Sequence, residues 1–450
     1  MKHFSMNRRG SFTAAEILSS AFCPLDCKYC YVPKTNSMKS LHKEIIRSLE
    51  DNSYIKTLEK VYGNNLKYLS FWGAEPTVSF EKIGRIIPQI FIKFSKLKSL
   101  NFSTSLMTNP NYILNFINLL INQNKKLQLN IQISLDGPAF ITDINRIKGA
   151  SKKVPENFCW IIKELNKTKF TNLNIRFRIK STFTINNIRM LNRSPGLIKE
   201  YFKYFDKIEK DFKKLNKNKE ITFTNSCAPT LSLPGEYTSE DGKELAVLFK
   251  YLRKRNCPNV YYLRMKKVFG SKDMLFVKPH MFTCSGGRNN IGLGIKGDLH
   301  ICHRSFFLNN KEHLDSILKQ NKAENWEINL FEQDKAKLIA NNFIIDIDDE
   351  KGKIRWQYVM RNYHDFTRLK NNYTIAMLKE LALCGQANKQ YLVDSNLCRL
   401  FAIFVNTAVS CPEAHLLNTG CVYFLPVSLI RIFANGVFLG FLKQFLKDEI

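Results

Sequence analysis

The stretch Cys23-Pro24-Leu25-Asp26-Cys27-Lys28-Tyr29-Cys30 decides how the rest of the chain is interpreted. Its cysteines follow the spacing C-x-x-x-C-x-x-C, directly after an expected β-strand. Three thiolates so close together in one loop can converge on one face of an iron–sulfur cluster. Because a 4Fe–4S cluster needs four ligands, three cysteines leave one iron open for a substrate or cofactor.

Zinc and buried free thiols are the alternatives for this loop. A structural zinc site usually has a fourth Cys or His near at hand, and His42 is the nearby candidate. The regular spacing in a loop after the first strand favours the cluster.

The first half of the chain alternates between short β-rich runs and helical patterns. We expect strands at 16–21, 67–72, 100–107, 128–135, 173–179 and 221–224, and helices at 40–58, 79–97, 112–123, 157–165 and 198–215. This alternation predicts βαβ units and a parallel sheet, open or closed into a barrel. Six strands are fewer than the eight of a full barrel, and functional residues should collect at their carboxyl ends.

The cysteine motif resembles that of the radical SAM enzymes, C-x-x-x-C-x-Φ-C, with Tyr29 as the aromatic Φ. The resemblance implies an α/β fold with a partial, TIM-like (β/α)6 barrel. It also implies that Cys23, Cys27 and Cys30 bind a catalytic 4Fe–4S cluster whose open iron binds S-adenosylmethionine. The reduced cluster would cleave this cofactor to methionine and a 5′-deoxyadenosyl radical, which abstracts hydrogen from the substrate. Tyr29 would pack near the adenine.

The second expected strand runs into Gly73-Ala74-Glu75-Pro76. This segment resembles the Gly-Gly-Glu-Pro motif of the same family, with Ala74 in the second position. The resemblance implies contact with the methionine amino group, since small residues allow close backbone approach and Glu75 can accept from an ammonium. The alternative is a plain strand-to-helix turn in which Pro76 starts the helix.

Two further segments end the third and fourth expected strands. The third ends in Met107-Thr108-Asn109-Pro110, where relatives often have Thr-Asn-Gly, so Pro110 is a departure. The fourth ends in Ser134-Leu135-Asp136-Gly137-Pro138, followed by Asp143-Ile144-Asn145-Arg146. These resemble the Ser-Leu-Asp-Gly-Pro segment and D-x-x-R of peptide-modifying members.

That resemblance implies that Ser134 and Arg146 contact the ribose and carboxylate of S-adenosylmethionine. A guanidinium suits a carboxylate because it is a planar, bidentate donor. The alternatives are a helix cap for Ser134 and a surface ion pair for Arg146. The expected cofactor-binding residues are Tyr29, Gly73, Ala74, Glu75, Pro76, Thr108, Asn109, Ser134, Asp136 and Arg146.

The segment from Cys284 to Cys302 resembles the start of a SPASM or twitch extension: a Cys, a β-hairpin with a turn at Gly297-Asp298, then G-x-x-x-x-C. The hairpin would bring Cys284 and Cys302 together as two ligands of an auxiliary cluster. The compact late cysteine group of complete SPASM domains is absent, so we expect at most one auxiliary 4Fe–4S cluster. The candidates to complete it are Cys384, Cys398, Cys411 and Cys421, with buried thiols as the alternative.

His303 follows Cys302 directly. In the anaerobic sulfatase-maturating branch of the family, an Asp in this position acts as a base. The departure weakens formylglycine formation as the specific activity. We expect His303 as a catalytic base, because a histidine can accept a proton near neutral pH; a structural histidine beside a cluster is the alternative.

Composition sets the wider limits. The chain has 450 residues, a formal net charge of +29, 44% hydrophobic residues and 12 Cys. It is too apolar for a disordered chain. The charge favours polyanionic partners, and is compatible with an acidic leader peptide. We expect no secretory signal. We also expect no membrane span, because charged residues and a proline interrupt the apolar segment 422–446. The cysteines then favour the reducing, oxygen-poor cytoplasm.

We therefore predict a radical SAM barrel at 12–270, a SPASM/twitch-like segment at 275–345 and a Cys-containing helical region at 346–450. The predicted function is hydrogen abstraction from a peptide or small protein, with flavodoxin or ferredoxin as electron donor. One alternative is the same chemistry on RNA, although no RNA-binding module or basic–aromatic stripe is apparent. A non-catalytic iron–sulfur sensor is the other.

Overall fold

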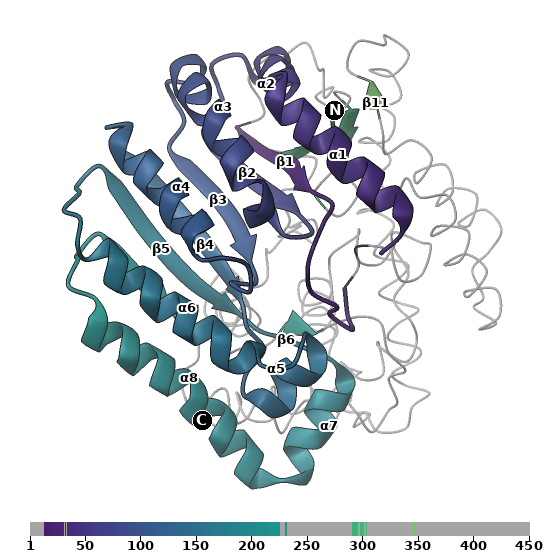
Figure 1. Cartoon of the computed structure of the whole chain (residues 1–450), viewed down its shortest axis with the longest axis vertical. Helices are drawn as coiled ribbons and strands as arrows, with labels where there is room; N and C mark the ends of the chain where they lie inside the picture. Colours follow the sequence, from purple (N-terminus) through teal and green to yellow (C-terminus); the bar gives the residue numbers. More distant parts are fainter. Residues whose placement is uncertain are drawn as a thin grey trace, which may run out of the picture.

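The computed structural model of the chain describes residues 13–30, 32, 34–225, 230–231, 290–295, 298–300, 303 and 345–346. In this part of the chain, a mainly parallel sheet is covered on one face by helices (Figure 1). The expected α/β fold is therefore confirmed for the region that carries the sequence motifs.

Six parallel strands follow one another in chain order across the sheet. They are β1 (Ala14–Ser20), β2 (Tyr68–Gly73), β3 (Ser99–Thr104), β4 (Leu127–Ser134), β5 (Leu173–Lys180) and β7 (Ile221–Thr224). All six were predicted from the sequence. A parallel order of this kind places the carboxyl ends of the strands along one edge, where the candidate residues gather.

The sheet continues beyond β1 on its other side. There β9 (Asn290–Leu293) pairs with β1 as a seventh parallel strand. The short β10 (Asp298–His300) pairs antiparallel with β9, and β11 (Ile345–Asp346) pairs antiparallel with β10. The expected hairpin is thus present, and it adds directly to the edge of the barrel sheet. Two further strands, β6 (Thr182–Phe183) and β8 (Thr230–Leu231), form a separate small sheet.

The helices occupy the connections between the strands. They are α1 (Asn36–Glu50), α2 (Ser53–Tyr62), the 3-10 helix η1 (Pro76–Ser79), α3 (Phe80–Lys93), α4 (Asn111–Asn122), α5 (Ala139–Asn145), α6 (Ala150–Leu165), α7 (Ile185–Arg193) and α8 (Pro195–Leu215). Among them, α3 packs against α1 and α4, and α6 packs against α4 and α8.

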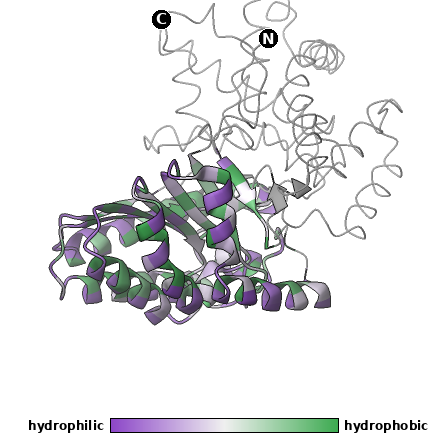
Figure 2. Ribbon diagram, turned by 90° about the horizontal axis from the view of Figure 1, so that it is seen from above, coloured by the Kyte–Doolittle hydropathy of each residue, from purple (hydrophilic) through white to green (hydrophobic). Residues whose placement is uncertain are grey.

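Alternation along the strands separates the apolar core from a polar face. Leu69, Phe71, Leu100 and Phe102 are buried on the side that carries the helices. Each such side chain contributes about 1.5–3 kcal/mol by leaving water. In Figure 2 the helices line one side of the sheet, with green apolar and purple polar residues alternating along them.

Two expected elements end differently in the structure, each for a local reason. The single helix expected at 40–58 is divided into α1 and α2, because Asn52 has a left-handed backbone with φ of 60°. The strand expected at 100–107 ends at Thr104, because Leu106 has a φ of 54° and turns the chain out of the sheet. Conversely, the helix expected at 157–165 begins earlier, at Ala150.

The predicted domains at 275–345 and 346–450 lie almost entirely outside the described residues, as do Cys284, Cys302, Cys384, Cys398, Cys411 and Cys421. In the described part, none of the helices has both the length and the apolar character that a membrane crossing requires.

Candidate active site

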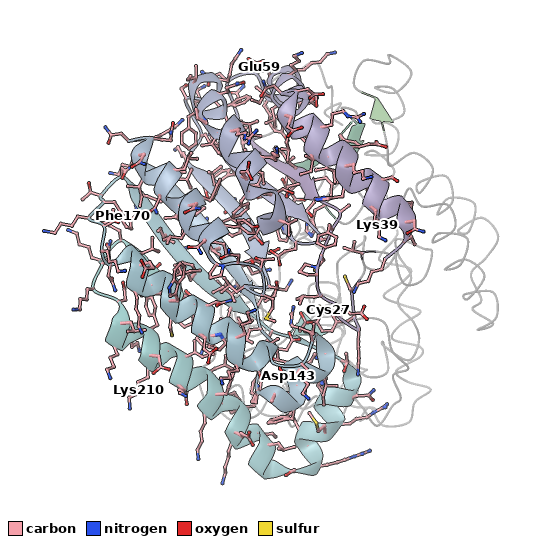
Figure 3. The ribbon with its side chains drawn as sticks, viewed as in Figure 1. Cys27, Lys39, Glu59, Asp143, Phe170 and Lys210 are labelled. Carbon is pink, nitrogen blue, oxygen red and sulfur yellow. The ribbon has the colours of Figure 1, made fainter. Side chains whose placement is uncertain are left out.

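The cysteine loop lies beyond the carboxyl end of β1 and is held by backbone hydrogen bonds on both sides. Ala74 N–H donates to the Ser20 carbonyl at 2.8 Å, and Glu75 N–H donates to the Phe22 carbonyl at 3.1 Å. Further along, Lys28 N–H donates to the Asn145 carbonyl at 2.9 Å, which ties the loop to the end of α5. Figure 3 shows Cys27 close to α5, which carries Asp143. The loop is therefore fixed between β2 and α5.

The three thiols of this loop differ in exposure. Cys23 and Cys27 are half-buried, and Cys30 is exposed. Burial raises the pKa of Cys23 to about 12 and that of Cys27 to about 11. Partial desolvation also raises the pKa of Cys30, although its side chain stays open to solvent. These thiols keep their protons at neutral pH, so an iron centre must displace the protons when it binds to the sulfurs.

The donor chemistry of the loop fits the cluster that the sequence predicts. Leu25 N–H points at Cys23 Sγ from 3.4 Å, and Arg146 Nη1 lies 4.0 Å from Cys27 Sγ. Both donors favour the charged thiolate form. Hydrogen bonds to the sulfurs also tune the reduction potential of such clusters. Within the described ranges, no three His, Cys, Asp or Glu side chains are grouped so that they could hold a single metal ion.

Arg146 does not form a surface ion pair, the alternative considered above. It is buried, and its Nε and Nη2 donate to the two carboxylate oxygens of Asp136, each at 2.9 Å. Burial opposes the charge, but Asp136 holds the pKa of Arg146 above its ordinary value. The bidentate face that was expected to meet the carboxylate of S-adenosylmethionine is therefore turned to Asp136, and Nη1 points toward Cys27.

Tyr29 joins the same cluster of side chains. Its hydroxyl donates to Asp136 Oδ2 at 2.6 Å, and its ring lies 5.4 Å from the Arg146 guanidinium. Burial raises the pKa of Tyr29 well above its ordinary value, so the hydroxyl keeps its proton. Thr182 N–H also donates to Asp136, at 2.8 Å. Asp136 thereby links the cysteine loop to the carboxyl ends of β4 and β5.

The segment from Gly73 to Pro76 is shaped by β1 as well as by its own turn. Gly73 has a φ of 140°, and a β-carbon there would lie 2.0 Å from the Ser20 carbonyl oxygen. Only glycine fits this approach. Pro76 begins η1, as the alternative interpretation of a strand-to-helix turn anticipated.

Glu75 is buried and turned toward neighbouring loops. Its Oε2 accepts from Ser105 N–H at 2.8 Å, and its Oε1 accepts from the Thr77 hydroxyl at 2.7 Å. Thr77 is in turn 2.9 Å from the hydroxyl of Thr108. The carboxylate therefore joins the loop after β2 to the loop after β3.

Ser134 and Asn109 complete the predicted set at this edge. Ser134 ends β4 beside Lys180 of β5, and its hydroxyl has no hydrogen-bond partner within the described part of the chain. Asn109 is exposed, and its side chain accepts from Asn111 N–H at 3.0 Å at the start of α4.

His303 is anchored to β1 through Glu16. Glu16 was not among the site residues predicted from the sequence. Glu16 Oε2 accepts from His303 N–H at 2.6 Å and lies 3.0 Å from His303 Nδ1. Asn290 Nδ2 donates to Glu16 Oε1 at 2.7 Å. Burial would raise the pKa of Glu16, but these contacts hold it below its ordinary value. The signal in the sequence was a carboxylate inside an otherwise apolar strand.

The His303 ring also stacks on Trp72, with 4.1 Å between ring centroids and 8° between planes. Trp72 immediately precedes Gly73, so this stack places His303 on the polar face of the sheet near the carboxyl end of β2. The structure thus brings His303 to the same barrel as the cysteine loop.

Comparison with known proteins identifies the first part of the chain. The sequence model of the radical SAM superfamily matches residues 17–193. No curated protein matches the chain.

Several solved structures align with part of this chain. Native anSMEcpe with bound AdoMet aligns with 20% identity and a TM-score of 0.40, over 65% of this chain and 74% of that one. The same protein with AdoMet and the Kp18Cys peptide aligns with 19% identity and a TM-score of 0.37, over 65% and 74%. Streptococcus suis SuiB bound to the precursor peptide SuiA aligns with 14% identity and a TM-score of 0.39, over 67% and 62%.

The superfamily match begins in β1 and ends at the last residue of α7, so it takes in the cysteine loop and every motif at the carboxyl ends of β2, β3 and β4. Residues 17–193 therefore form a radical SAM domain, a member of a superfamily of enzymes.

Proposed function

We propose that this protein abstracts hydrogen from a peptide or small protein substrate by radical SAM chemistry. The observation that carries the proposal is the cysteine loop, fixed at the carboxyl edge of the sheet against Asp136 and Arg146 within the matched domain. When bound and reduced, a 4Fe–4S cluster would supply the electron for cleavage of S-adenosylmethionine to methionine and a 5′-deoxyadenosyl radical.

In this proposal, Cys23, Cys27 and Cys30 hold the catalytic cluster. Gly73–Pro76, Thr108, Asn109 and Ser134 would hold S-adenosylmethionine. The hydroxyl of Ser134, which has no hydrogen-bond partner among the described residues, would be available to the ribose. Asp136, Arg146 and Tyr29 hold the cysteine loop through the hydrogen bonds among them, and from that position they would also contact S-adenosylmethionine.

A peptide substrate is supported by the resemblance of Ser134–Pro138 and the downstream D-x-x-R to peptide-modifying members. His303 would accept a proton from that substrate through Nε2, since Nδ1 is held at Glu16.

At most one auxiliary 4Fe–4S cluster would use Cys284 and Cys302 with two of Cys384, Cys398, Cys411 and Cys421. Flavodoxin or ferredoxin would supply electrons in an oxygen-poor cytoplasm.

The first test is the release of 5′-deoxyadenosine by the iron-loaded protein, reduced with dithionite under anaerobic conditions in the presence of S-adenosylmethionine. We expect wild-type protein to release it and Cys27→Ser to release none. Cys159→Ser is the matched control, because Cys159 lies on α6 away from the loop and should keep both iron and activity. Absence of the product from iron-loaded wild-type protein would contradict the proposal.

The substrate is tested by co-expression with short open reading frames encoded beside the gene, followed by mass spectrometry. A loss of about two hydrogens would indicate oxidative crosslinking, and an unchanged mass with altered retention would indicate epimerisation. Modified RNA with unmodified peptides would favour the alternative substrate class.

A further inference from the structure

The face of the sheet opposite the helices carries a row of polar side chains. Glu16, Ser70, Asn101, Asn130 and Arg176 stand in register on β1 to β5 and therefore share this face. The middle of the row is internally bonded: Asn101 Nδ2 donates to Ser70 Oγ at 3.2 Å, and Asn130 Nδ2 donates to Asn101 Oδ1 at 2.7 Å. At Glu16 the row is bonded to His303. Among the described residues of this row, only Arg176, at the end on β5, carries a charge with no hydrogen bond or ion pair to another described residue.

That end is a column of cations along β5. Arg176 and Arg178 are exposed, and their side chains form no hydrogen bond or ion pair with any other described residue. Lys180 continues the column at the level of Ser134. Successive members lie about 6.6 Å apart, since alternate residues of a strand point the same way. The column thus leads from inside the barrel to the edge where the cofactor residues gather.

We propose that Arg176 and Arg178 bind an extended, acidic segment of the peptide substrate, with carboxylates at alternate positions. This inference rests on the proposed function and narrows its substrate class. An extended peptide repeats its side chains with the same two-residue spacing as β5, so two carboxylates can meet two guanidinium groups at once. Each guanidinium can take a carboxylate through two parallel hydrogen bonds.

The neighbours of the column favour a peptide over a nucleic acid. Asn130 and Gln132 of β4 flank the two arginines on one side, and Thr222 and Thr224 of β7 flank them on the other. Side-chain amides and hydroxyls can form hydrogen bonds with the N–H and C=O groups of a peptide backbone. Single-stranded RNA is held on aromatic rings that stack with its bases, and none of these four flanking residues has a ring.

The test measures binding of short synthetic peptides to the full-length, iron-loaded protein by fluorescence anisotropy, under anaerobic conditions and with an uncharged fluorophore. One peptide alternates Glu with Thr, a second has Gln in place of Glu, and a third has Lys. We expect the Glu peptide to bind at least about tenfold more tightly than the Gln peptide, the equivalent of about 1.4 kcal/mol.

The decisive variant is Arg176→Glu with Arg178→Glu, which should reverse the preference so that the Lys peptide binds more tightly than the Glu peptide. Arg176→Gln with Arg178→Gln, a neutral pair, should abolish the preference even if the reversed pair folds poorly. The control is Lys153→Glu with Lys199→Glu, which makes the same change of net charge at exposed positions on α6 and α8 and should leave the preference intact.

Equal binding of the Glu and Gln peptides, or a preference that survives in both arginine variants, would overturn the proposal. So would arginine-dependent binding of a labelled oligouridylate without binding of the Glu peptide, which would make RNA the ligand. Release of 5′-deoxyadenosine by wild-type protein is measured separately. Its absence would count against the proposed function, whereas the peptide preference alone decides whether the column binds acidic segments.

Discussion

Asp136 is the residue on which the candidate site depends most. It is fully buried and accepts hydrogen bonds from Tyr29, Arg146 and Thr182. An ion pair taken out of water is a weak source of stability, but removing one partner leaves the other charge unpaired in a low dielectric. The pair therefore acts as a fixed link between the cysteine loop and the sheet.

We expect Asp136→Asn to lower the free energy of unfolding by about 3–5 kcal/mol, and Arg146→Met to have a comparable effect. The double variant should lose less than the sum, because neither charge is then left alone. Urea unfolding under anaerobic conditions measures all three.

Glu81→Gln serves as the control, because the Glu81–Arg85 pair on α3 is largely exposed. Water screens this pair, so its loss should change the unfolding free energy by less than about 1 kcal/mol. An Asp136→Asn protein as stable as Glu81→Gln would show that the buried pair does not hold the loop.

At the scale of the element, the contact between β1 and β2 sets the position of the cysteine loop. Gly73 lies so close to Ser20 that the two strand ends touch through their backbones, and the hydrogen bonds of Ala74 and Glu75 follow immediately. The backbone conformation after β2 therefore fixes the positions of the residues that precede Cys23.

Gly73→Ala should destabilise the protein by about 1–3 kcal/mol and lower its iron content, because the added methyl group would collide with the Ser20 carbonyl. Gly84→Ala is the matched control inside α3, where the nearest atom to a new β-carbon is Leu119 Cδ2 at 3.9 Å. That change should stabilise the helix by about 0.5–1 kcal/mol and leave iron binding unchanged. Equal iron content in the two variants would contradict the role assigned to Gly73.

Elements also show where prediction from the sequence succeeds. All six strands from β1 to β7 in the main sheet were predicted, because each is a short apolar run between helical patterns. The short α5 and α7, with 7 and 9 residues, were not, since so few turns give a weak periodic signal. The motifs marked the strand ends, but the sequence did not predict how their side chains bond to one another: the ion pair of Arg146 with Asp136 is seen only in the structure, and the contact of Arg146 with S-adenosylmethionine stays a prediction.

At the scale of the whole molecule, β9 returns to pair with the first strand of the sheet. Asn290 lies opposite Ala14, and Leu293 lies opposite Ile17. The bond from His303 to Glu16 spans 287 positions of the chain. No local pattern encodes a pairing over that distance, so the sequence did not predict that β9 joins this sheet.

A chain limited to residues 13–225 would lose β9 and expose the backbone edge of β1. We expect it to self-associate, because an unpaired, flat strand edge is a template for another chain. Light scattering during size-exclusion chromatography compares it with the full chain. A monodisperse, monomeric fragment would show that β1 is protected without β9.

The cysteine loop is positioned partly by backbone groups, through Ser20, Phe22 and Lys28, and partly by the side chains of Tyr29 and Arg146 at Asp136. Between its cysteines, the side chains of Pro24, Asp26 and Lys28 are exposed. Neither attachment uses the side chains of these three positions, and the ion pair of Asp26 with Lys34 is exposed and contributes little, so their mutational tolerance should far exceed that of the cysteines beside them. They form a natural place for a randomised library, in which the surroundings of the cluster could be altered by selection without moving its ligands.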